Sequence, residues 1–253
     1  MKENLMKVSM TTNHSKLALT MSIPYFFEPN IHHGQTSFTL SETTSKHCIQ
    51  VLRMQENQRV DVTNGKGYLF EAVIVNAHKT HTQVQVLSEK FKALPVQKIC
   101  LGIGLLKNLT RLEWLLEKIT EMGIYEIRPL ICEHTLFEKF KYERFQNILQ
   151  SAMIQSQQVW LPHLAKPIHF KDLIQEKYQG QKLIAHCASG HKLNIKNIEA
   201  ASTILLLIGP EGDFSKAEIE LALDHEFQAI ELGPTRLRTE TAALFALSVL
   251  KKF

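Results

Sequence analysis

The sequence predicts an α/β protein in which a parallel sheet, with helices on its faces, follows a smaller β-rich unit. In residues 25–94 apolar and polar side chains alternate, as they do in half-buried strands. After Pro95, short apolar runs alternate with stretches of helical period, an order typical of a parallel sheet covered by helices. Two of these runs, 205–208 and 229–232, lead directly into glycine, as expected for buried strands that stop at the edge of a sheet.

The composition indicates a globular chain with no membrane segment. It has 253 residues, 44% hydrophobic and 21% charged, which is long enough for two domains. The longest apolar runs, such as 205–208 and 244–250, are far shorter than the roughly 18 residues that span a membrane. No apolar stretch follows the N-terminal lysines, so a secretory signal is not indicated and we expect a cytoplasmic location. Because the net charge is only +4, binding to nucleic acid would require a local patch.

Neither a metal site nor a disulfide framework is expected. The four cysteines, Cys48, Cys100, Cys132 and Cys187, are far apart and form no C-x-x-C pair. The 12 histidines include no H-E-x-x-H motif and no pair four residues apart. We therefore expect reduced, partly buried cysteines and no bound metal.

The first 93 residues are predicted to form a short extension and a small β-rich domain. Residues 1–20 lack apolar periodicity, and we expect them to be a poorly ordered extension. Within 21–93, alternating strands flank the turn 64–67, which contains two glycines, as in a β-hairpin. The expected elements are strands over 60–63, 68–75 and 82–87 and a helix over 44–54 anchored by Val51 and Leu52. A domain of about 70 residues has a marginal core, so it should pack against another part of the chain.

Residues 94–253 are predicted to form the larger, α/β domain. An apolar stripe of helical period runs over 112–122 and stops at Gly123, a typical helix end. Ser215 and Glu218 form a capping box that opens another helix. Helices are expected over 112–122, 142–153, 215–225 and 241–252, and strands over 98–106, 124–131, 182–186, 202–208 and 228–232.

Two glycine motifs do not match phosphate-binding fingerprints. Gly102-Ile103-Gly104 lacks the third glycine of a dinucleotide-binding motif, because Lys107 occupies that position. The turn that starts at Gly209 is not a P-loop, since no G-K-[S/T] follows it. Ligands of open α/β sheets bind at the carboxyl ends of strands. We therefore expect the adjacent ends of strands 202–208 and 228–232 to share one small-molecule pocket.

Motifs around these two turns resemble those of one known family. Ile208-Gly209-Pro210-Glu211-Gly212 is followed by Glu218-Ile219, by Leu232-Gly233 and by Leu237-Arg238-Thr239-Glu240-Thr241-Ala242. Weaker matches occur upstream in the right order, over 47–53, 118–123 and 152–162. Together they resemble the RsmE family of bacterial 16S ribosomal RNA uracil-N3 methyltransferases, within the SPOUT superfamily. The resemblance covers the chain from about Met21 to its end.

This resemblance implies a fold, a cofactor and partners that composition does not show. Residues 21–93 would be a PUA-like β-barrel that helps to bind RNA. Residues 94–253 would be a SPOUT methyltransferase domain whose chain is tied into a trefoil knot, an exception to unknotted connectivity. The knot loops would bind S-adenosylmethionine near the subunit interface of a homodimer. The implied substrate is 16S ribosomal RNA within the small ribosomal subunit, and no metal is implied.

Cofactor binding is implied for the two turns and for one histidine. Close approach of the backbone to adenine favours glycine at Gly209, Gly212 and Gly233. Leu237 fits ordinary packing at the end of a strand equally well. The implied cofactor residues are His186, Ile208, Gly209, Glu211, Gly212, Leu232, Gly233 and Leu237.

Arg238 and Glu240 are the implied catalytic residues. Uracil N3 must lose its proton to be methylated, and Arg238 is suited to stabilise the anion by donating to a carbonyl oxygen. Glu240 is suited to accept a proton or to orient Arg238, although a carboxylate in the first turn of a helix also interacts favourably with the helix dipole. RNA contacts are implied for His47, Arg53 and Arg236, although an arginine at a helix end, such as Arg53, is also favourable to the dipole.

Five positions depart from the family pattern, two of which are Ser22 and Tyr25, where arginines are usual near the start. Asp213 stands where members usually have a second glycine, and Gln158 stands where they have an arginine. Thr235 replaces another arginine, while Arg236 follows one position later. These departures bear on RNA binding more than on the fold. Two alternatives remain open: another SPOUT methyltransferase, acting on ribose 2′-OH or a tRNA base, and an RNA-binding protein without catalysis.

Overall fold

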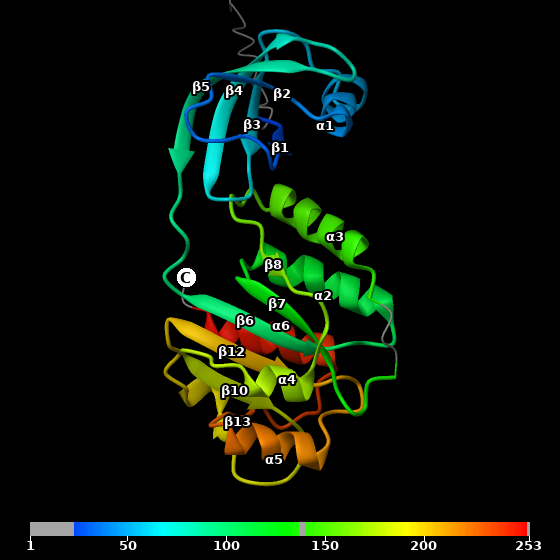
Figure 1. Ribbon diagram of the computed structural model, residues 1–253, viewed down its shortest axis with the longest axis vertical. Coiled ribbons are helices and arrows are strands. Elements are labelled where there is room, and N and C mark those ends of the chain that lie inside the picture. The colour runs from blue at the N-terminus through cyan, green and yellow to red at the C-terminus, as the bar shows by residue number, and fades with distance from the viewer. Residues whose placement is uncertain (1–22, 137–139, 252–253) are drawn as a thin grey trace, which may run out of the picture.

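The computed structural model describes residues 23–136 and 140–251, and it contains two sheets (Figure 1). A five-stranded sheet of order β1-β3-β4-β5-β2 lies at one end of the molecule. The other sheet has eight strands, seven in the order β11-β13-β10-β12-β6-β7-β8, with β9 paired to β7. The expected extension over 1–20 lies outside the described residues.

The N-terminal sheet is curled and mainly antiparallel. The predicted hairpin is confirmed, because β3 and β4 pair antiparallel with Val60 opposite Ala72. Alternate side chains of its strands, such as Val62, Phe70 and Val84, are fully buried and form its core. The strands are β1 (Tyr25–Phe27), β2 (Ser37–Thr39), β3 (Arg59–Thr63), β4 (Tyr68–Asn76) and β5 (Gln83–Phe91).

The predicted helix over 44–54 differs in its bounds and its anchors. It consists of α1 (Glu42–Lys46), capped by Ser41, and a π-helical turn, η1 (His47–Val51). Val51 and Leu52 are exposed, so they are not the anchors that we expected. The chain turns sharply at Arg53, whose φ is 55°. This turn brings the buried Met54 against Cys48, and these two side chains anchor the segment instead.

All pairs of the larger sheet are parallel, as predicted. The five expected strands and four expected helices are present, with ends shifted by a few residues. The strands are β6 (Lys98–Gly104), β7 (Glu126–Ile131), β8 (His163–Leu164), β9 (Ile168–His169), β10 (Gln181–Ala185), β11 (Leu193–Asn194), β12 (Thr203–Ile208) and β13 (Gln228–Glu231). The helices are α2 (Leu109–Glu121), α3 (Tyr142–Gln155), α4 (Phe170–Gln175), α5 (Lys216–Asp224) and α6 (Thr239–Leu250), with a short 3₁₀ turn, η2 (Ile195–Asn197).

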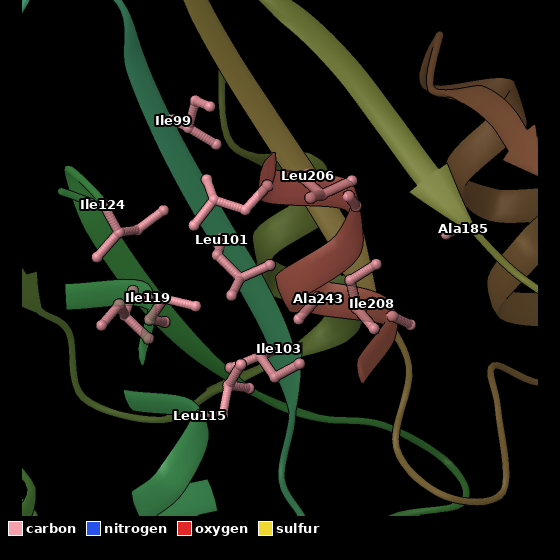
Figure 2. Close-up of a cluster of buried hydrophobic side chains, with 14 of the residues drawn as sticks. Ile99, Leu101, Ile103, Leu115, Ile119, Ile124, Ala185, Leu206, Ile208 and Ala243 are labelled. Carbon is pink, nitrogen blue, oxygen red and sulfur yellow. The ribbon is translucent and has the colours of Figure 1, made fainter. Parts of the chain in front are cut away.

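Helices cover both faces of this sheet, with α6 behind it and α4 in front in Figure 1. Alternate residues of the central strands point to opposite faces. On one face Leu101 and Leu206 pack against α2 and α6 (Figure 2). On the other, Cys100 and Leu205 pack in a second core with α4 and α5. Two-sided burial explains why these strands have nearly continuous apolar sequences.

One sequence expectation about the sheet is wrong. Strands β12 and β13 are not neighbours, because β10 pairs with both and lies between them. The order of parallel strands depends on how the crossover segments pass over the sheet, which periodicity along the chain does not show. The carboxyl ends of three strands therefore meet where we expected two.

The two sheets are connected by backbone contacts, as expected for a small domain with a marginal core. The β3–β4 turn bonds to the segment after α3, since Gly67 N donates to the Val159 carbonyl (2.8 Å) and Leu161 N donates to the Gly65 carbonyl (3.0 Å). A Cβ atom at Gly67 would lie 2.4 Å from the Trp160 ring, so only glycine fits this contact.

Candidate functional site

A pocket of about 760 Å³ lies at the carboxyl ends of β10, β12 and β13. The loops that follow these strands form its walls, together with the start of α6 and Arg111 of α2. This is the edge at which open parallel sheets bind ligands, and the volume suits a small molecule. Strands from distant parts of the chain thus converge on one site.

Nearly all the predicted cofactor residues line this pocket. Gly212 is the exception and does not line the pocket. It packs against the loop after β7, where a Cβ atom at position 212 would lie 2.9 Å from the Cβ of His134. Among the residues predicted to bind RNA or to act in catalysis, Arg236 and Arg238 also line the pocket. The lining cofactor candidates are His186, Ile208, Gly209, Glu211, Leu232, Gly233 and Leu237.

The loop over 209–214 is closely packed. Asp213 N donates to the Pro210 carbonyl (2.9 Å), which closes a tight turn. A Cβ atom at Gly209 would lie 3.0 Å from Phe214 N, and one at Gly104 would lie 2.3 Å from Pro210 N. The Gly102-Ile103-Gly104 motif therefore has a packing role at its second glycine, where β6 meets this loop. Glu211 connects the same region, since its carboxylate accepts a hydrogen bond from Lys107 N (3.2 Å).

The loop over 232–238 leads from β13 into α6. Gly233 has a φ of 133°, a conformation that residues with side chains rarely adopt, and a Cβ atom there would meet open space. Arg238 is the N-cap residue of α6, and its carbonyl accepts from Ala242 N (2.7 Å). The side chains of Arg236 and Arg238 are exposed, and neither makes a hydrogen bond or an ion pair with any described residue.

His186 follows β10 and carries buried polar atoms. Neither ring nitrogen has a hydrogen-bond partner within the described part of the chain, and the backbone carbonyl accepts from Lys192 Nζ (2.9 Å). Burial lowers the pKa of His186, as does the nearby Lys192, while Asp213 opposes the shift. Buried polar atoms without partners are unusual in proteins, and at a pocket wall they fit a ligand.

Glu240 makes an ion pair that the sequence analysis missed. This carboxylate is 8% exposed, and its Oε1 lies 3.7 Å from Arg111 Nε of α2. Its Oε2 is buried and has no hydrogen-bond partner among the residues described. Arg111 and Glu240 are far apart in the sequence, so no local pattern indicated the pair.

The remaining predicted residues lie away from the pocket. His47 and Arg53 lie in and just after the helical turn η1, beside the N-terminal sheet, where both are exposed, and the His47 and Phe26 rings form a T-shaped pair. Gln158 donates to the carbonyls of Thr120 (2.8 Å) and Glu121 (3.0 Å) and so caps the C-terminal end of α2. The residue that replaces the family's arginine at 158 thus has a structural contact.

Cysteine positions agree with the expected reduced state. Cys48, Cys100 and Cys132 are buried and Cys187 is exposed, and all four are free thiols. No group of three or more histidine, cysteine or acidic side chains suited to a metal ion occurs in the described ranges. No described helix is long and apolar enough to cross a membrane.

Comparison with known proteins places the chain in the class of RNA methyltransferases. Residues 92–251 match a family model for an RNA methyltransferase domain, and residues 40–87 match one for an RNA methyltransferase PUA domain. The chain is 31% identical over 224 residues to the ribosomal RNA small subunit methyltransferase E of Synechocystis, covering 85% of this chain and 72% of that protein.

Two further comparisons agree. The protein of that name from Bacillus subtilis is 26% identical over 230 residues, covering 85% of this chain and 89% of the relative. The crystal structure of the Neisseria gonorrhoeae protein of that name, bound to S-adenosylmethionine, has a TM-score of 0.79 and 29% identity. It covers 89% of this chain and 95% of that one. This chain belongs to the ribosomal RNA small subunit methyltransferase E family, which confirms the resemblance.

Proposed function

We propose that this protein transfers a methyl group from S-adenosylmethionine to N3 of a uracil at a specific uridine of 16S ribosomal RNA. The observation that carries the proposal is the convergence of separate sequence motifs on one pocket. The motifs at 208–212 and 232–238 lie on strands that β10 separates, yet their residues line the same cavity. Membership of the chain in the ribosomal RNA small subunit methyltransferase E family supports 16S ribosomal RNA as the substrate.

The described residues fit S-adenosylmethionine. The pocket has room for a molecule of this size, with apolar walls from Ile208, Leu232 and Leu237. His186 offers buried ring nitrogens without partners, and Gly209 and Gly233 expose backbone groups to the cavity. When bound, the cofactor supplies a methyl group on a sulfonium, which a nucleophilic nitrogen can take.

The protein's side chains would prepare the uracil for this attack. N3 carries a proton between two carbonyls, and its loss leaves a negative charge shared by the carbonyl oxygens. Arg238 would stabilise that charge by donating hydrogen bonds to a carbonyl oxygen, because its guanidinium is exposed at the pocket and has no partner among the described residues. Glu240 does not itself line the pocket, but its carboxylate pairs with Arg111, which does. Its proposed part is to accept a proton or to orient the arginines at this end of α6.

We further propose that the chain has two domains with different roles. Residues 21–93 would be a PUA-like barrel that binds RNA through His47 and Arg53, and residues 94–253 a SPOUT domain with a trefoil knot. The family resemblance supports this architecture, and the matches to PUA and methyltransferase domain models support its division into two domains. The protein would bind 16S ribosomal RNA in the cytoplasm, within the small ribosomal subunit.

Arg53→Ala is expected to weaken RNA binding and leave cofactor affinity unchanged, because Arg53 is exposed in the turn between η1 and β3, away from the pocket. Loss of one phosphate contact should lower the slope of log affinity against log salt by about 0.7 to 0.9. Filter binding to a 16S fragment at several salt concentrations measures this slope. Arg59→Ala removes an exposed arginine from the neighbouring strand β3 and serves as the control. Equal slopes for both variants would remove Arg53 from the RNA interface.

The protein is expected to be a homodimer with the cofactor pocket near the subunit interface. Sedimentation velocity at micromolar concentration should give a dimer, since the family resemblance implies a two-fold assembly. A monomer that methylates RNA at full rate would contradict this.

Mass spectrometry of 16S nucleosides from a deletion strain and its complemented strain tests the proposed function. We expect N3-methyluridine to disappear in the deletion strain and to return on complementation. Loss of a ribose-methylated nucleoside or of a tRNA modification would favour the other SPOUT activities. Unchanged nucleosides, with no heat of S-adenosylmethionine binding in calorimetry, would favour an RNA-binding protein without catalysis. The match to a PUA domain ahead of the methyltransferase domain favours the ribosomal RNA substrate.

A further inference from the structure

We propose that Asp213 is a positioning residue that joins two walls of the cofactor pocket and fixes their relative position. The two walls are the 209–214 loop after β12 and the 186–192 loop after β10. The proposal rests on the proposed function, because it assigns this role for binding of S-adenosylmethionine.

Both carboxylate oxygens of Asp213 accept hydrogen bonds from the backbone. Oδ2 accepts from Cys187 N (2.7 Å) and Oδ1 accepts from Phe214 N (2.8 Å). The ladder between β10 and β12 ends at the pair Ala185 and Ile208. The hydrogen bond from Cys187 N to Asp213 therefore connects the loops after β10 and β12, beyond the point where the two strands stop pairing. Bonds of this kind, to a charged acceptor, are stronger than those between neutral groups.

Asp213 holds this position in a backbone conformation that usually favours glycine. Its φ is 64°, in the left-handed region, which aspartate tolerates better than most residues do. Its carbonyl oxygen lies 3.1 Å from His134 Nδ1, on the loop after β7. A glycine would adopt the same φ without strain but would provide no carboxylate for Cys187. The side chain at 213 thus adds a connection between loops that glycine does not provide.

This connection acts on a wall that faces the ligand. Cys187 directly follows His186, whose ring nitrogens are buried without partners, and both residues line the pocket. Fixing Cys187 N limits the positions that His186 can occupy before the cofactor arrives. A wall that is ordered in advance loses less conformational entropy on binding, so affinity is higher.

Two variants separate the carboxylate from the backbone conformation. In Asp213→Gly, glycine adopts the positive φ without strain, and both acceptor oxygens of the carboxylate are lost. In Asp213→Asn, the side chain also tolerates this φ and keeps one carbonyl oxygen as an acceptor. Asp172→Asn, on the exposed side of α4, is the charge-matched control. Calorimetry would give the Kd for S-adenosylmethionine, and hydrogen exchange would report protection of the Cys187 amide in the free protein.

We expect Asp213→Gly to raise this Kd about tenfold or more and to speed exchange at Cys187. Asp213→Asn should lie between it and the wild type, and the KM for the cofactor should rise more than kcat falls. Wild-type affinity in the glycine variant would overturn the proposal, and so would faster exchange without loss of affinity. If the glycine variant does not fold, the asparagine variant decides by the same two criteria. A wild-type protein that binds no S-adenosylmethionine would refute the proposed function, and the role assigned to Asp213 with it. Exchange at Cys187 would then show only whether the two loops are joined.

Discussion

Gly209→Val and Gly233→Val are each expected to abolish binding of S-adenosylmethionine, for two different physical reasons. At Gly209 a Cβ atom would lie 3.0 Å from Phe214 N and 3.2 Å from the carbonyl carbon of Asp213, so valine must displace the loop. At Gly233 no atom is within 4 Å, but φ is 133°, where a β-branched residue is strongly disfavoured. Both variants alter the pocket wall, and calorimetric titration measures the loss.

Gly34→Val is the matched control for Gly233→Val. Gly34 also has a positive φ, 83°, with open space around its Cβ position, but it lies in the turn between β1 and β2 and does not line the pocket. The control should bind S-adenosylmethionine as the wild type does, while showing a comparable loss of stability in thermal unfolding. If both pocket variants fold and retain wild-type affinity, the cofactor does not bind at this pocket.

Arg238→Ala should reduce methyl transfer on the order of 10²-fold at saturating RNA and cofactor, because stabilisation of the uracil anion would be lost. The melting temperature should hardly change. The side chain of Arg238 is exposed and unpaired among the described residues, and the N-cap contact of α6 uses its backbone carbonyl. Single-turnover kinetics with radiolabelled cofactor measures the chemical step.

Arg236→Ala provides the contrast, since Arg236 lies on the same loop and also faces the pocket. It should raise the KM for RNA with a smaller effect on kcat, as expected for a residue that contacts RNA without stabilising the anion. Arg238→Lys should restore part of the rate, because the charge remains while the planar donor group is lost. Full turnover by Arg238→Ala would make Arg238 a structural residue.

Much of the fold was predictable because its strongest signals are local. The helical period before Gly123 and the capping box of Ser215 and Glu218 predicted α2 and α5, and both are confirmed. Short elements such as β8 (His163–Leu164) and α4 were missed, since two to six residues are too few to show a period. The anchors of the first helical segment were also missed, because a positive φ at Arg53 redirects the chain toward Met54.

For this protein, the sequence by itself determined the class of fold, the family and most residues of the pocket. Apolar periodicity and turn residues act over a few positions, and the motifs at 208–212 and 232–238 carry their chemistry in adjacent residues. Only the tertiary structure decided that β10 lies between β12 and β13, that Arg111 pairs with Glu240, and that Asp213 bonds to Cys187 N. Each of these contacts joins residues distant in the sequence, and their meeting depends on the path of the chain across the sheet.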